Sequence, residues 1–138
     1  MTQLKILIFS LLLISLSLSG CESKSTQAAI TGVIAHSHTM QIPVGFTLTI
    51  QIEDITKSDT PGKDIAQKVI ESTGEVLPMP FEVVYDPKKI KADHAYCVQV
   101  MIADSTGKVL YSNIAVVPVI TDGNPTQHIE VDVDLING

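Results

Sequence analysis

Apolar and polar residues alternate along much of this chain, and the alternation constrains its fold more than any other feature. In residues 46–53 (FTLTIQIE) every second residue is large and apolar, and residues 129–135 (IEVDVDL) repeat the pattern with acidic residues in between. Successive side chains of an extended strand point to opposite sides, so a period of two buries one face of a strand. No stretch has a helical period beyond a single turn at residues 86–90. The alternation therefore predicts an all-β protein.

Several more short strands are expected along the chain, at residues 30–38, 65–71, 81–85, 96–102 and 109–119, the last interrupted near Ser112-Asn113. Turns rich in Gly, Pro, Asp and Asn separate them, at residues 43–45, 59–62, 86–87, 104–107 and 122–125. Many short strands at regular spacing predict an antiparallel β-sandwich, immunoglobulin-like, with seven to eight strands. We find no internal repeat and no second domain.

The N-terminal segment is typical of a cleaved signal peptide and is not counted as part of the fold. Lys5 precedes an apolar run at residues 6–18 that only three serines interrupt. The run is shorter than the about 20 apolar residues that a transmembrane helix needs. The small residues Ser19 and Gly20 then suit a signal peptidase site. An ordinary cleaved signal followed by a chance cysteine is the alternative to the lipoprotein signal described next.

Leu18-Ser19-Gly20-Cys21 resembles the bacterial lipobox, in which the thiol is lipidated before cleavage makes the cysteine the new N-terminus. Cleavage is expected between Gly20 and Cys21, and two or three acyl chains would anchor the protein stably, whereas one chain binds marginally. Glu22, where inner-membrane retention calls for Asp, favours the outer membrane by the lipoprotein sorting rule. The expected organisation is a signal peptide at 1–20, a lipidated tether at 21–28 and a sandwich domain at 29–138.

The charge of the chain excludes some classes of partner. The 138 residues carry a formal net charge of −6 without any arginine, and cleavage would remove Lys5 but no acidic residue. An acidic surface repels nucleic acid and anionic lipid headgroups, so neither is a predicted partner, and the expected membrane contact is through the N-terminal lipid. With Cys21 lipidated, Cys97 has no partner for a disulfide. Its parity places it on the same strand face as Gln99, which predicts a half-buried, unreactive thiol.

No motif of an enzyme is present in the sequence. There is no G-x-S-x-G elbow and no suggestion of a Cys–His pair, so nucleophilic catalysis has no support. The carboxylates mostly alternate outward on strands or lie in turns, where solubility explains them. We therefore predict a protein that is not an enzyme, without a cofactor or a small-molecule substrate.

A metal site is the main chemical alternative. His36, His38 and Met40 would lie on one side of an extended strand, about 6.5–7 Å apart along it, and His with Met suits soft copper. Neighbouring strands could add His94, Met101 or His128. The spacing is long for one ion, and an exposed strand end with ordinary polar side chains explains the same residues. No metal site is predicted, and a copper- or zinc-binding lipoprotein is kept as the alternative.

A series of motifs resembles the YscW/YbaY-type lipoprotein family over nearly the whole mature chain. The most specific part pairs P-x-P-F-E with Y-D-P, and the motifs in order are Gly32-Val33, Ile42-Pro43-Val44-Gly45, residues 49–59, Pro78-Met79-Pro80-Phe81-Glu82, Tyr85-Asp86-Pro87, Tyr96 and Thr121-Asp122-Gly123-Asn124-Pro125. The resemblance implies a small β-sandwich lipoprotein. Some members of this family act as type III secretion pilotins, which bring an outer-membrane secretin to its site and help it assemble. A general envelope lipoprotein is the other reading that the resemblance allows.

The residues of these motifs also have a structural explanation, and we interpret them as fold markers. Pro78 and Pro80 cannot donate ladder hydrogen bonds, so the strand through Phe81 is expected to begin just after them or to lie at an edge. Phe81 and Tyr85 share a parity that points to the core. The remaining residues, Asp86, Pro87, Gly123, Asn124 and Pro125, suit turns. A partner segment is expected to bind by groove packing or strand addition, at an edge near residues 114–120 or at the front strand.

Overall fold

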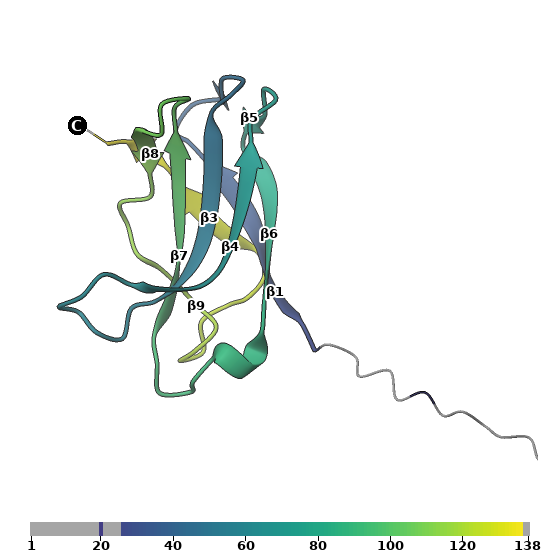
Figure 1. Cartoon of the computed structure of the whole chain (residues 1–138), viewed down its shortest axis with the longest axis vertical. Coiled ribbons are helices and arrows are strands. Elements are labelled where there is room, and N and C mark those ends of the chain that lie inside the picture. The colour runs from purple at the N-terminus through teal and green to yellow at the C-terminus, as the bar shows by residue number, and fades with distance from the viewer. Residues whose placement is uncertain (1–19, 21–25, 137–138) are drawn as a thin grey trace, which may run out of the picture.

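The computed structural model describes residue 20 and residues 26–136, which form two β-sheets packed against each other (Figure 1). The predicted signal peptide and Cys21 therefore lie outside the described residues, apart from Gly20. The elements in chain order are β1 (Ala28–Ala35), β2 (Met40–Gln41), β3 (Thr47–Asp54), β4 (Lys63–Glu71), β5 (Val76–Leu77), β6 (Met79–Tyr85), the 3₁₀ turn η1 (Pro87–Lys89), β7 (Tyr96–Ala103), β8 (Val109–Ser112), β9 (Val117–Val119), β10 (Ile129–Asp132) and β11 (Asp134–Leu135).

The smaller sheet has the strand order β10-β1-β6, and the larger one has the order β11-β8-β7-β3-β4, with β9 also paired to β7. A short ribbon of β2 and β5 completes the described part. The chain passes from the small sheet to the large sheet at Val133, whose N–H donates to the Ala35 carbonyl at 2.9 Å. The two sheets are thus joined by the last strands of the chain as well as by their common core.

The core lies between the inward faces of the two sheets, where the alternating residues meet. In β3 the apolar side chains of Leu48, Ile50 and Ile52 are buried in the core, and the polar Gln51 on the other face is 9% exposed. In β10 Ile129 and Val131 are buried while Glu130 is exposed. Burial of each such aliphatic side chain contributes about 1.5–3 kcal/mol to folding. The predicted all-β class is confirmed, and eight of the described strands have three or more residues. The immunoglobulin-like detail stays a prediction.

Two expectations about the first long strand are wrong. β1 ends at Ala35 rather than His38, and it lies in the middle of its sheet rather than at an edge. The sandwich is also not purely antiparallel, because β10 pairs with β1 in parallel. The chain reaches β10 through a long connection after β9, which allows the two strands to run in the same direction.

At the predicted interruption near Ser112-Asn113 the chain stops pairing with β7 as β8, and it pairs with β7 again a few residues later as β9. β8 ends at Ser112, and β9 resumes the pairing with β7 at Val117. Between them the Asn113 side chain takes the place of a strand: its Oδ1 accepts from the Val100 N–H at 2.7 Å, and its Nδ2 donates to the Val98 and Ala115 carbonyls at 3.1 and 3.0 Å. The backbone groups of β7 are therefore satisfied although the chain bulges outward at residues 114–116.

Candidate functional site

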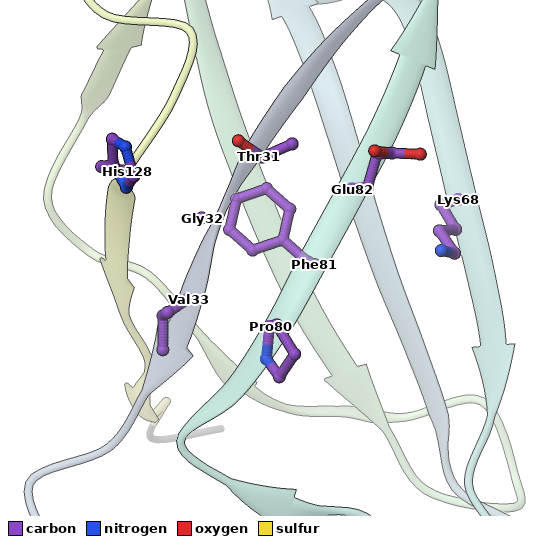
Figure 2. Close-up of a pocket in the computed structure, with 8 residues that line it drawn as sticks. All are labelled: Thr31, Gly32, Val33, Lys68, Pro80, Phe81, Glu82 and His128. Atoms are coloured by element: carbon purple, nitrogen blue, oxygen red, sulfur yellow. The ribbon is translucent and has the colours of Figure 1, made fainter.

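An open hollow of about 520 Å³ lies beside the pairing of β1 with β6. Figure 2 shows the Phe81 ring in the centre of its residues, with His128 on one side and Glu82 and Lys68 on the other. We call it the motif hollow, because five of its lining residues belong to the family motifs: Gly32, Val33, Pro80, Phe81 and Glu82. Motifs far apart in the sequence thus meet at one place.

The register of the two strands explains how the motif hollow is built. Gly32 pairs with Phe81, and Val33 pairs with Pro80. A Cβ atom on Gly32 would lie 1.9 Å from the carbonyl oxygen of Ile129 and 2.9 Å from Cε1 of Phe81. Glycine is therefore required for β10 and the Phe81 ring to come this close to β1. Val33, by contrast, points outward and remains 39% exposed.

Two strand edges beside the motif hollow, those of β4 and β6, carry residues that oppose an added strand. Lys68 of edge strand β4 pairs with Ile50, a core residue, so its side chain starts on the inward face of the sheet. An inward charge on an edge strand opposes pairing with another chain, and so does proline. Pro80 lies in edge strand β6. Pro118 lies in the short β9, which pairs with β7 and does not line the motif hollow. Groove packing is thus favoured over strand addition at these edges.

Tyr85, Asp86 and Pro87 lie at the end of the sandwich where β1 begins, whereas Pro78 lies at the opposite end, beside the end of β1. Pro78 precedes β6, and Tyr85 ends it, 7% exposed and paired with Ala28. The Asp86 carboxylate accepts the Lys88 N–H at 2.9 Å and caps η1, which Pro87 begins. These placements give each residue a role in folding.

A second hollow, of about 420 Å³, lies where the Tyr85-Asp86-Pro87 and Thr121–Pro125 segments meet. Here Ile120, Asp122 and Gly123 have left-handed backbones, with φ of 73, 58 and 76°. This conformation is costly for a β-branched residue such as Ile120. The turn is held by its own hydrogen bonds, from the Asn124 side-chain amide to the Thr121 carbonyl and from the Thr121 hydroxyl to the His94 carbonyl, both at 2.7 Å. Pro125 follows this turn, and its carbonyl accepts the Ile120 N–H at 3.4 Å.

A third hollow, of about 430 Å³, is lined by four lysines, and we call it the lysine hollow. Its floor is the pair of Asp54 and His94, whose Oδ2 and Nδ1 atoms lie 2.6 Å apart. Burial alone would raise the pKa of the Asp54 carboxyl, but hydrogen bonds from Thr56 and His94 and the charge of His94 outweigh it and lower the pKa to about 2. The total charge of the chain gives no sign of this site, because its lysines lie in separate segments that only the fold brings together.

The lowered pKa of Asp54 predicts a loss of stability in acid. A carboxyl with a depressed folded-state pKa stabilises the fold above its unfolded value of about 4, and this contribution is lost as the pH falls toward about 2. The urea midpoint of the wild type is therefore expected to fall between these pH values, and that of Asp54→Asn to fall less. Asp59→Asn, in the exposed loop before β4, is the matched control. Equal losses in wild type and Asp54→Asn would contradict the prediction.

The geometry assumed for the metal alternative is wrong. His36 and His38 follow the end of β1 in a bend and are not on one side of an extended strand. The His36 Nδ1 lies 3.3 Å from the backbone nitrogen of His38, and its ring packs edge-on against Tyr111. Met40 begins the next strand, β2. Among residues 26–136 no cluster of three or more His, Cys, Asp or Glu side chains could hold a metal ion.

Cys97 is more deeply buried than expected. It pairs with Glu53 of β3 on one side and with Pro118 of β9 on the other, and only 5% of it is exposed. The prediction that Cys97 shares a strand face with Gln99 is correct. That face is covered, however, by β9 and the neighbouring side chains. Burial, with the charge of Glu53, raises the pKa of the Cys97 thiol to about 11. A thiol of this pKa stays protonated and unreactive at neutral pH.

The comparisons with known proteins agree with these motifs. The model of a protein family described as "Type III secretion system lipoprotein chaperone (YscW)" matches residues 25–131. This chain belongs to the YscW family. No curated protein sequence matches this chain. Within residues 26–136 there is no helix with the length and apolar character that crossing a membrane requires.

A solved structure has the same fold as this YscW-family chain. It is described as an alternative pilotin from the type II secretion system of Vibrio cholerae. The two superpose with a TM-score of 0.73 and are 29% identical, over 81% of this chain and 99% of the pilotin. The similarity thus extends over the whole of the solved domain rather than over a shared fragment.

Proposed function

We propose that this YscW-family chain is a lipid-anchored, pilotin-like chaperone that binds a short segment of a secretin-type envelope protein. The observation that carries the proposal is the family match over residues 25–131, joined by the similarity to a pilotin along 99% of that pilotin's length. Its work is binding and placement, without catalysis.

The anchor in this proposal is Cys21, lipidated and made N-terminal by cleavage after Gly20, on the periplasmic face of the outer membrane. Its support is the order of the sequence: a charged start, a short apolar run, small residues and cysteine. Residues 21–28 then form the tether, and residues 29–138 form the domain. Two or more acyl chains supply an anchor that one would not.

The motif hollow is the docking surface that we propose for the partner segment. It joins the exposed apolar wall of Val33 and a floor at the Phe81 ring, a core residue that is 6% exposed, to two opposite charges, Lys68 and Glu82. Such a mixture of apolar surface with a few polar groups is what grooves for short segments offer. Because Lys68 and Pro80 oppose strand addition at the edges of β4 and β6, the segment is expected to pack its side chains into the hollow.

The test compares four full-length proteins expressed in cells that contain the secretin: wild type, Cys21→Ser, Val33→Glu and Val69→Glu. After crosslinking, the membranes are separated and co-purifying proteins are identified. Wild type is expected in the outer membrane with the secretin. Cys21→Ser should remove the secretin from the outer membrane, and Val33→Glu should stay in the outer membrane but recover about tenfold less secretin, as burying one unpaired charge predicts.

Val69→Glu is the matched control for the docking surface. Val69 is 56% exposed and lies on β4, next to Lys68 in the chain but on the opposite face of the strand. It should recover as much secretin as wild type. Equal losses with both valine variants would exclude the motif hollow as the docking surface. Wild type in the outer membrane without any specific partner would leave a general envelope lipoprotein.

A further inference from the structure

The lysine hollow has a charge opposite to that of the chain as a whole. It is lined by Lys57, Lys63, Lys89 and Lys91, and Asp54 is the one carboxylate that lines it within the described residues. The acidic residues that neighbour these lysines in the sequence, Asp59, Asp64 and Asp93, do not line it. Glu53 lies close to the loop before Lys63, since its Oε2 would be 2.6 Å from a Cβ atom on Gly62, but it does not line the hollow. In a chain with a formal net charge of −6, the lining of this hollow thus holds four lysines and one carboxylate.

The floor of the lysine hollow is held in place by hydrogen bonds. The Asp54 carboxylate is already bound by His94 and Thr56, so its charge is engaged. The Lys91 N–H donates to the hydroxyl of Tyr96 at 2.9 Å, and Tyr96 is only 1% exposed. The Ile55 N–H donates to the Ala95 carbonyl, also at 2.9 Å. The segments that carry the lysines are therefore fixed to each other across the end of the sandwich.

The lysine hollow lies at the end where the chain enters the domain. Ala28, the first residue of β1, pairs with Tyr85, and the next residues form η1, which ends at Lys89. Figure 1 shows β1 starting at the same end of the sandwich as η1 and the loop between β3 and β4. The chain from Cys21 to Ala28 reaches about 25 Å at most when fully extended. A lipid on Cys21 would keep this end of the domain near the bilayer.

We propose that the lysine hollow binds the phosphate groups of anionic phospholipids in the membrane that holds the acyl chains. This inference rests on the proposed lipid anchor. Lysines near an anionic bilayer are attracted to it, and the attraction decays within a Debye length, so only lysines held close to the surface contribute. The contact turns the end of the sandwich where β1 begins toward the bilayer. It leaves the motif hollow, which lies on the side of the domain, open to a partner.

The acidic composition predicted no binding to headgroups, but the local arrangement of lysines outweighs the total charge at this distance.

The test measures the reactivity of individual lysines in the acylated protein. The protein is inserted into phosphatidylcholine vesicles, or into vesicles in which about a third of the lipid is phosphatidylglycerol, and is labelled briefly with an amine-reactive ester. Mass spectrometry then gives the labelling rate of each lysine. In the anionic vesicles the four lysines of the hollow are expected to react about fivefold more slowly than in neutral vesicles, and high salt should abolish the difference. Lys68 and Lys108, away from this end, serve as internal controls and should not change.

A variant provides the second measurement. With Lys57, Lys63 and Lys89 replaced by glutamine, Lys91 should lose its protection in anionic vesicles, whereas Lys68→Gln with Lys108→Gln should leave it protected. Equal labelling in both vesicles would overturn the proposal. Protection that needs added secretin would assign the hollow to an acidic protein segment, and protection by inorganic phosphate in detergent would assign it to free phosphate; both overturn it too.

Failure of the anchor is recognised separately. Flotation with phosphatidylcholine vesicles reports the acyl chains alone, because these vesicles carry no net charge. A protein that does not float with neutral vesicles contradicts the proposed anchor. A protein that floats with them but shows no protection in anionic vesicles keeps the anchor and loses the headgroup site.

Discussion

Replacing Gly32 by alanine is expected to lower the free energy of unfolding by about 3 kcal/mol or more, the range of severe overpacking. Gly32 lies in β1 between β10 and β6, and a Cβ atom there would be 1.9 Å from the Ile129 carbonyl oxygen. That atom belongs to the backbone, so β10 and β1 would have to separate. The Phe81 ring, the floor of the motif hollow, would also have to move. Urea denaturation followed by circular dichroism measures the loss.

Gly62→Ala is the matched control for this substitution. A Cβ atom on Gly62 meets the Glu53 side chain, whose Oε2 would lie 2.6 Å away. The carboxylate can rotate away, and the Glu53 Cβ atom, at 3.1 Å, has to shift by only a few tenths of an ångström, so the loss of stability should stay near about 1 kcal/mol, well below that of Gly32→Ala. If Gly32→Ala were as stable as Gly62→Ala, the close approach of β10 to β1 would not require a glycine.

Asn113→Ala is expected to lower the free energy of unfolding by about 2–4 kcal/mol, because it leaves buried backbone groups without partners. The Val100 N–H loses its acceptor at 2.7 Å, and the Val98 carbonyl loses its donor at 3.1 Å. Asn113 is itself 7% exposed, so water does not readily replace the amide. Urea denaturation gives the stability, and hydrogen exchange at the Val100 amide should become faster.

Asn124→Ala is the matched control: it removes the same side-chain amide at a position where that amide makes a single hydrogen bond. The Asn124 amide donates to one carbonyl, that of Thr121 at 2.7 Å, in a partly buried turn. Losing one such bond should cost about 1 kcal/mol. Equal costs for the two variants would mean that Asn113 does not substitute for a strand in the ladder of β7.

The alternation of residues predicted the strands well wherever one face is buried. β3 and β10 follow the pattern closely, because burial on one face selects every second residue regardless of what packs against it. The pattern failed beyond Ala35, where His36 and Met40 continue a polar and apolar mixture but the chain bends. Periodicity does not record where a strand loses its neighbour, so the end of β1 could not be found from it.

The burial of Cys97 shows a second kind of failure. Its parity was read correctly, but parity tells only which face of a strand a residue occupies. Whether that face is covered depends on the short strand β9 and on the β3 residue Glu53, which lie elsewhere in the sequence. Likewise the lysines of the lysine hollow come from three segments of an acidic chain.

The all-β class, most of the strands and the resemblance to YscW lipoproteins can be read from the sequence, because side-chain alternation and turn residues act over a few neighbouring positions. The fold is needed to see that Gly32-Val33 meets Pro80-Phe81-Glu82 in one hollow, and that lysines gather at the end of the domain where β1 begins. These contacts between distant segments depend on the register between strands and on the packing of the two sheets. Both are set by contacts between residues far apart in the chain, which a local pattern does not encode.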